Sequence, residues 1–268
     1  MTDPILALTG IWKKFGSVQA LHDVDLEVGA REVVALVGDN GAGKSTLVNV
    51  IAGVDPANSG KIYWQGNHVS IGNPHDAAAL GIATVYQDLS LCDNLDVVAN
   101  LFLGNETVRF GVLDEIGMER TAQEQLRSLK VELPNLRVPV SALSGGQRQS
   151  VAITRARLRS PKLVILDEPT AALGVPQTSQ VLGLIKELRG SGLGVILITH
   201  NLTDVMAVAD RVVVLRLGHN AGEFVINNDT RQDIEQDIVA AITGASTAAP
   251  SRGRSMGSAT ISITEAER

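Results

Sequence analysis

The chain of 268 residues contains a single cysteine and no long apolar run. Because Cys92 has no second cysteine to pair with, no intrachain disulfide can form. We expect a protein of the reducing cytosol in which Cys92 is a small packing residue. No apolar stretch reaches the length of about 18 residues that a membrane-spanning helix requires. The opening residues, MTDPILALTG, include an acid and a proline and predict no secretory signal.

Basic residues are outnumbered by acidic ones, so that the net charge is −6 and the pI about 5.4. Sequence-independent binding of nucleic acid rests on Lys and Arg side chains that neutralise phosphates, and we therefore expect no nucleic-acid partner. Hydrophobic residues make up 44% of the chain, which is enough for one large domain with its own core.

Four short apolar runs predict strands that are buried on both faces, as in a parallel sheet. They span residues 32–37, 162–166, 194–199 and 211–217. Because stretches with helical spacing separate these runs, the alternation predicts an α/β domain with a mostly parallel core sheet. Near the N-terminus, alternating runs at 5–8 and 24–28 predict an antiparallel β-subdomain with one exposed face.

Between about residues 89 and 160 the buried-strand runs stop. Apolar residues recur there at three- and four-residue spacing, which predicts a helical subdomain inserted into the sheet domain. A last helix at 230–242, closed by Gly244, would end a domain that spans residues 1–244. Residues 245–268 are small and polar with little periodicity, and we expect a disordered tail.

The segment GDNGAGKST matches the phosphate-loop pattern G-x-x-x-x-G-K-[ST]. Glycines let the backbone N–H groups face one anion, Lys44 can reach the terminal phosphates, and the Ser45 hydroxyl can bind Mg²⁺. The alternative is a glycine-rich turn with a solvated lysine, but the motif lies between a buried strand and a helix. The expected nucleotide contacts are Gly38, Asp39, Asn40, Gly41, Ala42, Gly43, Lys44, Ser45 and Thr46.

Two acids, Asp167 and Glu168, follow the buried run LVIL. Acids in this position are costly unless a cation or hydrogen bonds compensate them. Asp167 is placed to hold Mg²⁺ through water, and Glu168 is placed to polarise the attacking water as general base. A helix-capping role for one of the acids is the alternative. Beside a phosphate loop, the pair favours hydrolysis of a nucleoside triphosphate.

The pentapeptide LSGGQ opens an amphipathic stretch and predicts a second helix N-terminus with exposed N–H groups. An ordinary capped helix start is the alternative interpretation. This pentapeptide is the signature of the ABC ATPase family, which the chain resembles over about residues 5–240, with the motifs in family order. The resemblance assigns ATP contacts to Ser144, Gly145, Gly146 and Gln147.

The resemblance implies roles for three further residues. Phe15 matches the aromatic residue that stacks on adenine, although a core aromatic is the alternative. Gln87 matches the loop glutamine that senses Mg²⁺ and the attacking water, and His200 matches the switch histidine that contacts the γ-phosphate. With Glu168, Gln87 and His200 make up the expected catalytic set, and Ser45, Gln87 and Asp167 the expected Mg²⁺ ligands.

In the family, ATP lies between the phosphate loop of one chain and the LSGGQ of a second chain packed head to tail. The resemblance therefore implies a dimer, bound to integral membrane permease subunits at the cytoplasmic face of the cell membrane. Segments such as ALGI and NLFLG resemble the ATPases of ribose, xylose and fructose importers. Because this chain has one ATP-binding domain, it resembles the single-domain members of that branch. The resemblance implies a sugar-binding protein as an indirect partner. One departure is Gly174, where the family usually has an aspartate that contacts the partner.

Three other functions are compatible with part of the pattern. A transporter for another small solute would share every motif. Soluble ABC ATPases of DNA repair and chromosome organisation carry long coiled coils, for which the stretch between Gln87 and Leu143 is too short and has no sustained heptads. Ribosomal members fuse two domains through a charged linker, which this sequence does not contain. A simple P-loop kinase or GTPase explains neither LSGGQ nor its place before LVILDEP.

Overall fold

The computed structural model describes residues 4–226 and 231–245. Its core is a six-stranded sheet in which β11, β3, β10, β9 and β6 are parallel and β12 is an antiparallel edge strand. In sheet order the strands are β12 (His219–Val225), β11 (Arg211–Arg216), β3 (Val33–Val37), β10 (Gly194–Ile198), β9 (Leu163–Asp167) and β6 (Ile82–Val85). The predicted α/β fold with a mostly parallel core sheet is confirmed.

Both faces of the core sheet are covered, which explains the continuous apolar runs. In β3, Val33, Ala35 and Val37 contribute to one hydrophobic cluster, and Val34 and Leu36 contribute to the other. The first cluster includes residues of the helices at 145–158, 175–190, 202–208 and 231–243. The second includes residues of the helices at 44–51 and 74–80 and of the N-terminal strands. Every residue of β3 is buried. The strand therefore lacks the polar–apolar alternation that is typical of a half-exposed strand.

A four-stranded antiparallel sheet packs beside the core, in the order β2 (Val18–Val28), β1 (Leu6–Phe15), β4 (Ser59–Trp64) and β5 (Asn67–Val69). The predicted N-terminal antiparallel unit is confirmed, and residues 24–28 alternate between buried and exposed as expected. For residues 5–8 the expected exposed face is wrong, because Ile5, Leu6, Ala7 and Leu8 are all buried. β1 lies between β2 and β4, and its first residues are covered on both faces.

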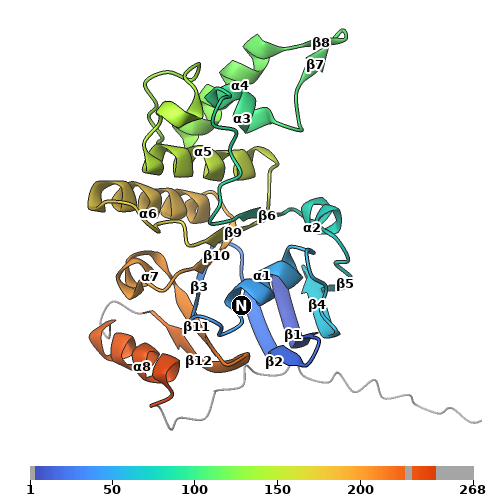
Figure 1. Ribbon diagram of the computed structural model, residues 1–268, viewed down its shortest axis with the longest axis vertical. Helices are drawn as coiled ribbons and strands as arrows, with labels where there is room; N and C mark the ends of the chain where they lie inside the picture. Colours follow the sequence, from blue (N-terminus) through green and yellow to red (C-terminus); the bar gives the residue numbers. More distant parts are fainter. Residues whose placement is uncertain (1–3, 227–230, 246–268) are drawn as a thin grey trace, which may run out of the picture.

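The helices connect and cover these sheets (Figure 1). They are α1 (Lys44–Ile51), α2 (Pro74–Leu80), α3 (Val97–Phe102), α4 (Glu115–Ser128), α5 (Gly145–Leu158), α6 (Val175–Gly190), α7 (Leu202–Val208) and α8 (Arg231–Thr243), with a short 3-10 helix at Val140–Ala142. Figure 1 shows α3, α4 and α5 at the upper end of the molecule, above α6 and the core sheet. No helix in the described ranges is long and apolar enough to cross a bilayer.

Several elements have no counterpart in the predicted set. β4, β5, β6, β12 and α2 are not among the expected elements, and a small hairpin of β7 (Val108–Arg109) and β8 (Val112–Leu113) interrupts the region expected to be helical. The limits of the inserted subdomain and of the 1–244 domain stay predictions. The tail expected beyond Gly244 lies, except for Ala245, outside the described residues.

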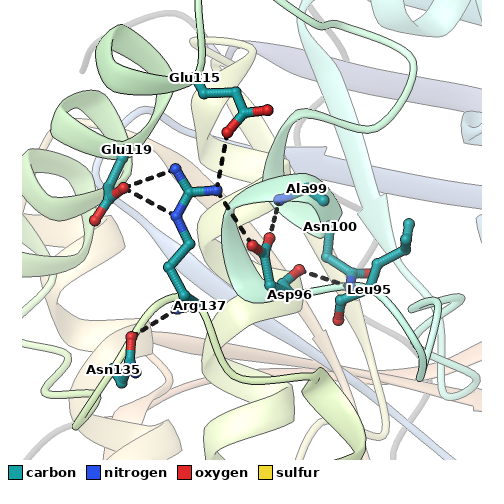
Figure 2. Close-up of polar contacts among 8 residues, drawn as sticks. All are labelled: Leu95, Asp96, Ala99, Asn100, Glu115, Glu119, Asn135 and Arg137. Atoms are coloured by element: carbon teal, nitrogen blue, oxygen red, sulfur yellow. Dashed lines mark hydrogen bonds and ion pairs between the residues drawn. The ribbon is translucent and has the colours of Figure 1, made fainter.

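The segment that follows the Gln87 loop is joined to the segment that precedes LSGGQ. Backbone bonds run from Val140 N to Leu95 O at 3.0 Å and from Ser141 N to Asp93 O at 3.1 Å. Arg137 adds ion pairs to Asp96 at 3.4 Å, Glu115 at 3.5 Å and Glu119 at 2.8 Å (Figure 2). The two motif-bearing segments therefore belong to one connected part of the structure.

Asn100 in α3 is the buried centre of this part, and its side chain is fully inaccessible (Figure 2). Its Oδ1 accepts a hydrogen bond from Cys92 N at 2.7 Å. Its Nδ2 donates to the carbonyls of Cys92, Leu95 and Asp96 at 3.0–3.1 Å. One amide thus bonds four backbone groups of a non-helical segment: it is the acceptor for the Cys92 N–H and a second donor to three carbonyls.

Replacing Asn100 with Ala would leave the Cys92 N–H and the three carbonyls without this partner. We expect Asn100→Ala to lower the free energy of unfolding by about 1–3 kcal/mol, because the Cys92 N–H loses its acceptor while the carbonyls keep their backbone donors. Denaturant unfolding measures this change, with the exposed Asn94→Ala as control. Equal stability of the two variants would contradict the assigned role.

Candidate functional site

The parallel register of the core sheet brings four predicted loops to one edge. Leu36 of β3 is paired with Ile198 of β10, so the loop after Val37 begins level with Thr199 and His200. Ile198 is also paired with Asp167 of β9, and Leu166 is paired with Val85 of β6. The phosphate loop, the acidic pair, His200 and the Gln87 loop therefore leave the sheet side by side.

The phosphate loop curls back because its glycines adopt backbone conformations that other residues avoid. Gly41 has φ +81° and Gly43 has φ +106°. A Cβ atom on Gly43 would lie 2.8 Å from Cδ2 of Leu21, whereas a Cβ atom on Gly41 would meet nothing within 4 Å. No side chain caps the N-terminus of α1. The loop thus leaves open space and free helix N–H groups on one side, as an anion site requires.

Lys44 lies at the centre of the loop and is largely buried. Its Nζ donates to the carbonyl oxygens of Gly38 at 2.6 Å and Asp39 at 3.0 Å. Burial lowers the pKa of Lys44, while the charges of Glu168, Asp39 and Asp167 act in the opposite direction. The ammonium group is therefore held between the loop and the acidic pair.

Asp167 and Glu168 occupy the end of β9. Burial raises the pKa of the Asp167 carboxyl, Glu168 raises it further, and Lys44 opposes both. Glu168 has φ +47°, a left-handed conformation that costs a non-glycine residue roughly 1–2 kcal/mol. Its N–H donates to Ile198 O at 2.9 Å, which anchors the strained backbone to β10. The capping role considered for these acids is not seen, because the next helix, α6, begins at Val175.

His200 faces Glu168 directly. Its Nδ1 lies 2.9 Å from Oε1 of Glu168, and the imidazole is largely exposed while the carboxylate is mostly covered. One edge of the ring is thus fixed by the carboxylate, and the rest of the ring faces solvent. This arrangement can orient a water molecule or a phosphate oxygen beside the general-base candidate.

A hydrogen bond near this contact joins two residues that were not predicted from the sequence. The Thr170 hydroxyl donates to Oδ2 of Asp204 at 2.6 Å, and Asp204 is only 3% exposed. No pattern in the sequence marks this pair, because Thr170 lies in the loop after β9 and Asp204 lies in α7, far along the chain.

The Gln87 loop is also held from the helical part of the chain. Gln87 itself is exposed. Arg155 of α5 donates to Leu89 O at 2.7 Å and to Ser90 O at 2.8 Å. Arg155, which the sequence analysis did not single out, therefore ties the signature helix to the loop that carries Gln87.

The signature residues lie apart from the cluster at the sheet edge. Ser144 caps α5: its Oγ accepts from Gln147 N at 3.3 Å, and Gln147 Oε1 accepts from Ser144 N at 2.9 Å. A Cβ atom on Gly145 would lie 3.0 Å from Leu173, and a Cβ atom on Gly146 would lie 2.8 Å from Gln177. The structure thus has the capped helix start, and an ATP contact of the signature stays a prediction.

Two further positions are Gly174, where the chain departs from the family pattern, and Phe15, the expected adenine contact. A Cβ atom on Gly174 would lie 2.7 Å from Oε1 of Gln177, so the Gln177 amide occupies the space beside this glycine. Phe15 ends β1, is 46% exposed and has Lys13 Nζ 5.0 Å from its ring centroid. The core alternative for Phe15 is therefore wrong, and its ring is accessible for stacking.

Comparison with known proteins places these motifs in a family context. A family described as "ABC transporter" matches residues 21–171. The xylose/arabinose import ATP-binding protein of Sulfolobus acidocaldarius is 44% identical over 80% of this chain and 85% of that protein. The fructose import ATP-binding protein of Rhizobium meliloti is 42% identical over 81% of this chain and 86% of its own length. The ribose import ATP-binding protein of Burkholderia mallei is 42% identical, but this chain spans only 44% of it.

Solved structures show the same fold. The ADP conformation of an ATP-binding cassette of an ABC transporter has a TM-score of 0.80 and 28% identity, and the match covers 91% of this chain and 100% of that one. A dimeric post-hydrolysis cassette bound to ADP and Pi has a TM-score of 0.70 and 26% identity over 83% of this chain and 99% of that one. The structural neighbours include a cassette that binds nucleotide as a dimer.

The raised pKa of Asp167 predicts a stabilising substitution. Between the ordinary and the raised pKa, the folded state binds more protons than the unfolded state, so stability falls as the pH rises through this range. Asp167→Asn removes the charge and is expected to raise the Tm by about 2–4 °C at neutral pH without Mg²⁺. The gain should vanish below about pH 4, where an ordinary Asp is protonated.

Thermal unfolding in chelator, at both pH values, measures this difference. The exposed Asp88→Asn serves as the control that removes an equal charge. A Tm gain of the same size at both pH values, or a lower Tm of Asp167→Asn at neutral pH, would contradict the assigned cause.

Proposed function

The chain belongs to the ABC transporter family of ATP-binding proteins, and we propose that it hydrolyses ATP to energise the import of a monosaccharide. The observation that carries hydrolysis is the convergence of Lys44, Asp167, Glu168 and His200 at one edge of the core sheet. The monosaccharide rests on relatives that share most of their length with this chain and are named as sugar import proteins. The specific sugar is left open.

The proposed chemistry follows from the positions of these groups. The phosphate loop and Lys44 bind the terminal phosphates and offset their charge. Glu168 accepts a proton from the attacking water, and His200, fixed by the same carboxylate, orients the γ-phosphate. The exposed Phe15 ring stacks on adenine. Because these groups follow strands, they hold their geometry without reorganising during the reaction.

Mg²⁺ fits the oxygen donors at this edge, namely the Ser45 hydroxyl, the Asp167 carboxylate and the Gln87 amide. Within the described ranges no group of three His, Cys, Asp or Glu side chains could hold a metal ion by itself. Such a site suits Mg²⁺, which takes its remaining oxygens from phosphates and water. When bound, the ion would neutralise charge that develops on the phosphate oxygens.

We further propose that two copies act together. A single phosphate loop leaves the γ-phosphate open to water, and a second helix N-terminus, that of α5 in the partner, would close it. The relatives are import proteins, which supports docking on permease subunits at the cytoplasmic face of the membrane, with a sugar-binding protein as indirect partner.

Replacing the proposed general base tests hydrolysis. Glu168→Gln is expected to keep ATP binding, to lower kcat by at least about 100-fold because proton transfer is lost, and to accumulate as an ATP-bound dimer. Steady-state ATPase assays and light scattering measure both effects. Glu132→Gln removes an exposed carboxylate elsewhere and is the control. Unimpaired turnover of Glu168→Gln would disprove the base assignment.

The transport substrate is tested with the permease that co-purifies with the chain from its own membranes. In nanodiscs, one monosaccharide-loaded binding protein is expected to raise ATP hydrolysis several-fold, whereas the same protein without sugar should not. Stimulation by a loaded binding protein for a different class of solute, and by no sugar-loaded protein, would overturn the sugar assignment while leaving the ATPase assignment intact.

A further inference from the structure

Asp204 is a buried carboxylate that the proposed reaction does not use. It lies four residues after His200, in the first turn of α7, and is 3% exposed. In the part of the chain that the structure describes, it belongs to no ion pair. Burying a carboxylate is unfavourable unless hydrogen bonds compensate it. The side-chain donor that compensates Asp204 is Thr170, at 2.6 Å.

This hydrogen bond is the outermost of three links between the end of β9 with the loop that follows it and the segment from the end of β10 into α7. The first joins the strand ends, where Glu168 N donates to Ile198 O at 2.9 Å. The second joins the side chains of Glu168 and His200 at 2.9 Å. The third joins Thr170, two residues after Glu168, to Asp204. The Glu168–His200 contact is therefore held from both sides.

The loop that carries Glu168 needs such support. Glu168 and Ala172 both have left-handed φ values, +47° and +59°. Hydrogen bonds from Ala171 N to Glu168 O at 3.1 Å and from Leu173 N to Thr170 O at 3.3 Å close two overlapping turns here. Strained conformations of this kind persist only when the surroundings over-determine them. Thr170 lies between Glu168 and Ala172, and its hydroxyl reaches Asp204 in α7.

The other end of the link is equally fixed. Asn201 Oδ1 accepts from Thr203 N at 3.0 Å and from Asp204 N at 3.4 Å, and Asn201 N donates to Thr199 Oγ1 at 3.1 Å. Asn201 thus bonds to Thr199, which precedes His200, and to the first turn of α7, which follows His200. A side chain anchored to Asp204 is therefore anchored to the backbone that positions His200.

We propose that Thr170 and Asp204 are positioning residues, whose hydrogen bond holds the Glu168 carboxylate against the His200 imidazole. They act through these two residues and not on ATP. The inference rests on the proposed ATPase function. It predicts that loss of the bond lowers turnover and leaves nucleotide affinity almost unchanged, because a displacement of about 1 Å at a reacting group can cost about 100-fold in rate.

The test compares Thr170→Val, which loses the hydroxyl at nearly constant shape, with Thr170→Ser, which keeps it. For Thr170→Val we expect a fall in kcat of about 10–100-fold with KM for ATP within about threefold, and for Thr170→Ser a kcat near that of the wild type. Thr203→Val removes an exposed hydroxyl one residue from Asp204 and is the matched control. An unchanged kcat in folded Thr170→Val, or equal losses in the Val and Ser variants, would overturn the proposal.

A second variant covers the case in which Thr170→Val does not fold. Asp204→Ala removes the acceptor together with the buried charge, so it should fold, and the same loss of kcat is expected. The double variant should be no slower than either single variant, because both remove one bond. Full turnover of Asp204→Ala, or additive losses in the double variant, would reject the pair. If the wild type itself did not hydrolyse ATP, the proposed function would fail instead.

Discussion

Parallel pairing of β3, β10, β9 and β6 in one register is the constraint on which the rest of the structure depends. Each of these strands ends at the same edge, and each is followed by a loop that carries a predicted site residue. A slip of one residue in β9 would exchange its two buried faces and would move Glu168 away from Ile198 and His200. Such a slip would bury no additional apolar surface, because apolar clusters already cover both faces of the sheet.

The sequence predicted best what long apolar runs and glycine-rich turns encode. Residues 32–37 and the motif that follows them specify a buried strand, a phosphate loop and a helix without any tertiary information. The burial of residues 5–8 could not be predicted, because it depends on the cover that β2, β4 and the second cluster provide. Thr170, Asp204 and Arg155 were missed for a related reason: their roles come from contacts between segments far apart in the chain, and none has a characteristic neighbour in sequence.

The site combines rigid and strained parts. Left-handed backbone at Glu168 is tolerated because its N–H is bound to β10 and its carboxylate to His200. On the helical side, Arg155 ties α5 to the Gln87 loop. The Gln87 loop is thus bonded directly to the helix that the signature begins. Separately, Val140 and Ser141 bond to the segment that the Asn100 side chain holds.

The proposed reaction requires a site that two chains complete, with the phosphate loop from one chain and the signature from the other. Mixing two inactive variants tests it most directly: Lys44→Ala chains lack the loop lysine, and Ser144→Arg chains have a blocked signature. Their heterodimer would contain one intact site, with Lys44 from one chain and Ser144 from the other. The mixture is expected to hydrolyse ATP well above the sum of the two variants measured separately. A mixture no more active than that sum would contradict it.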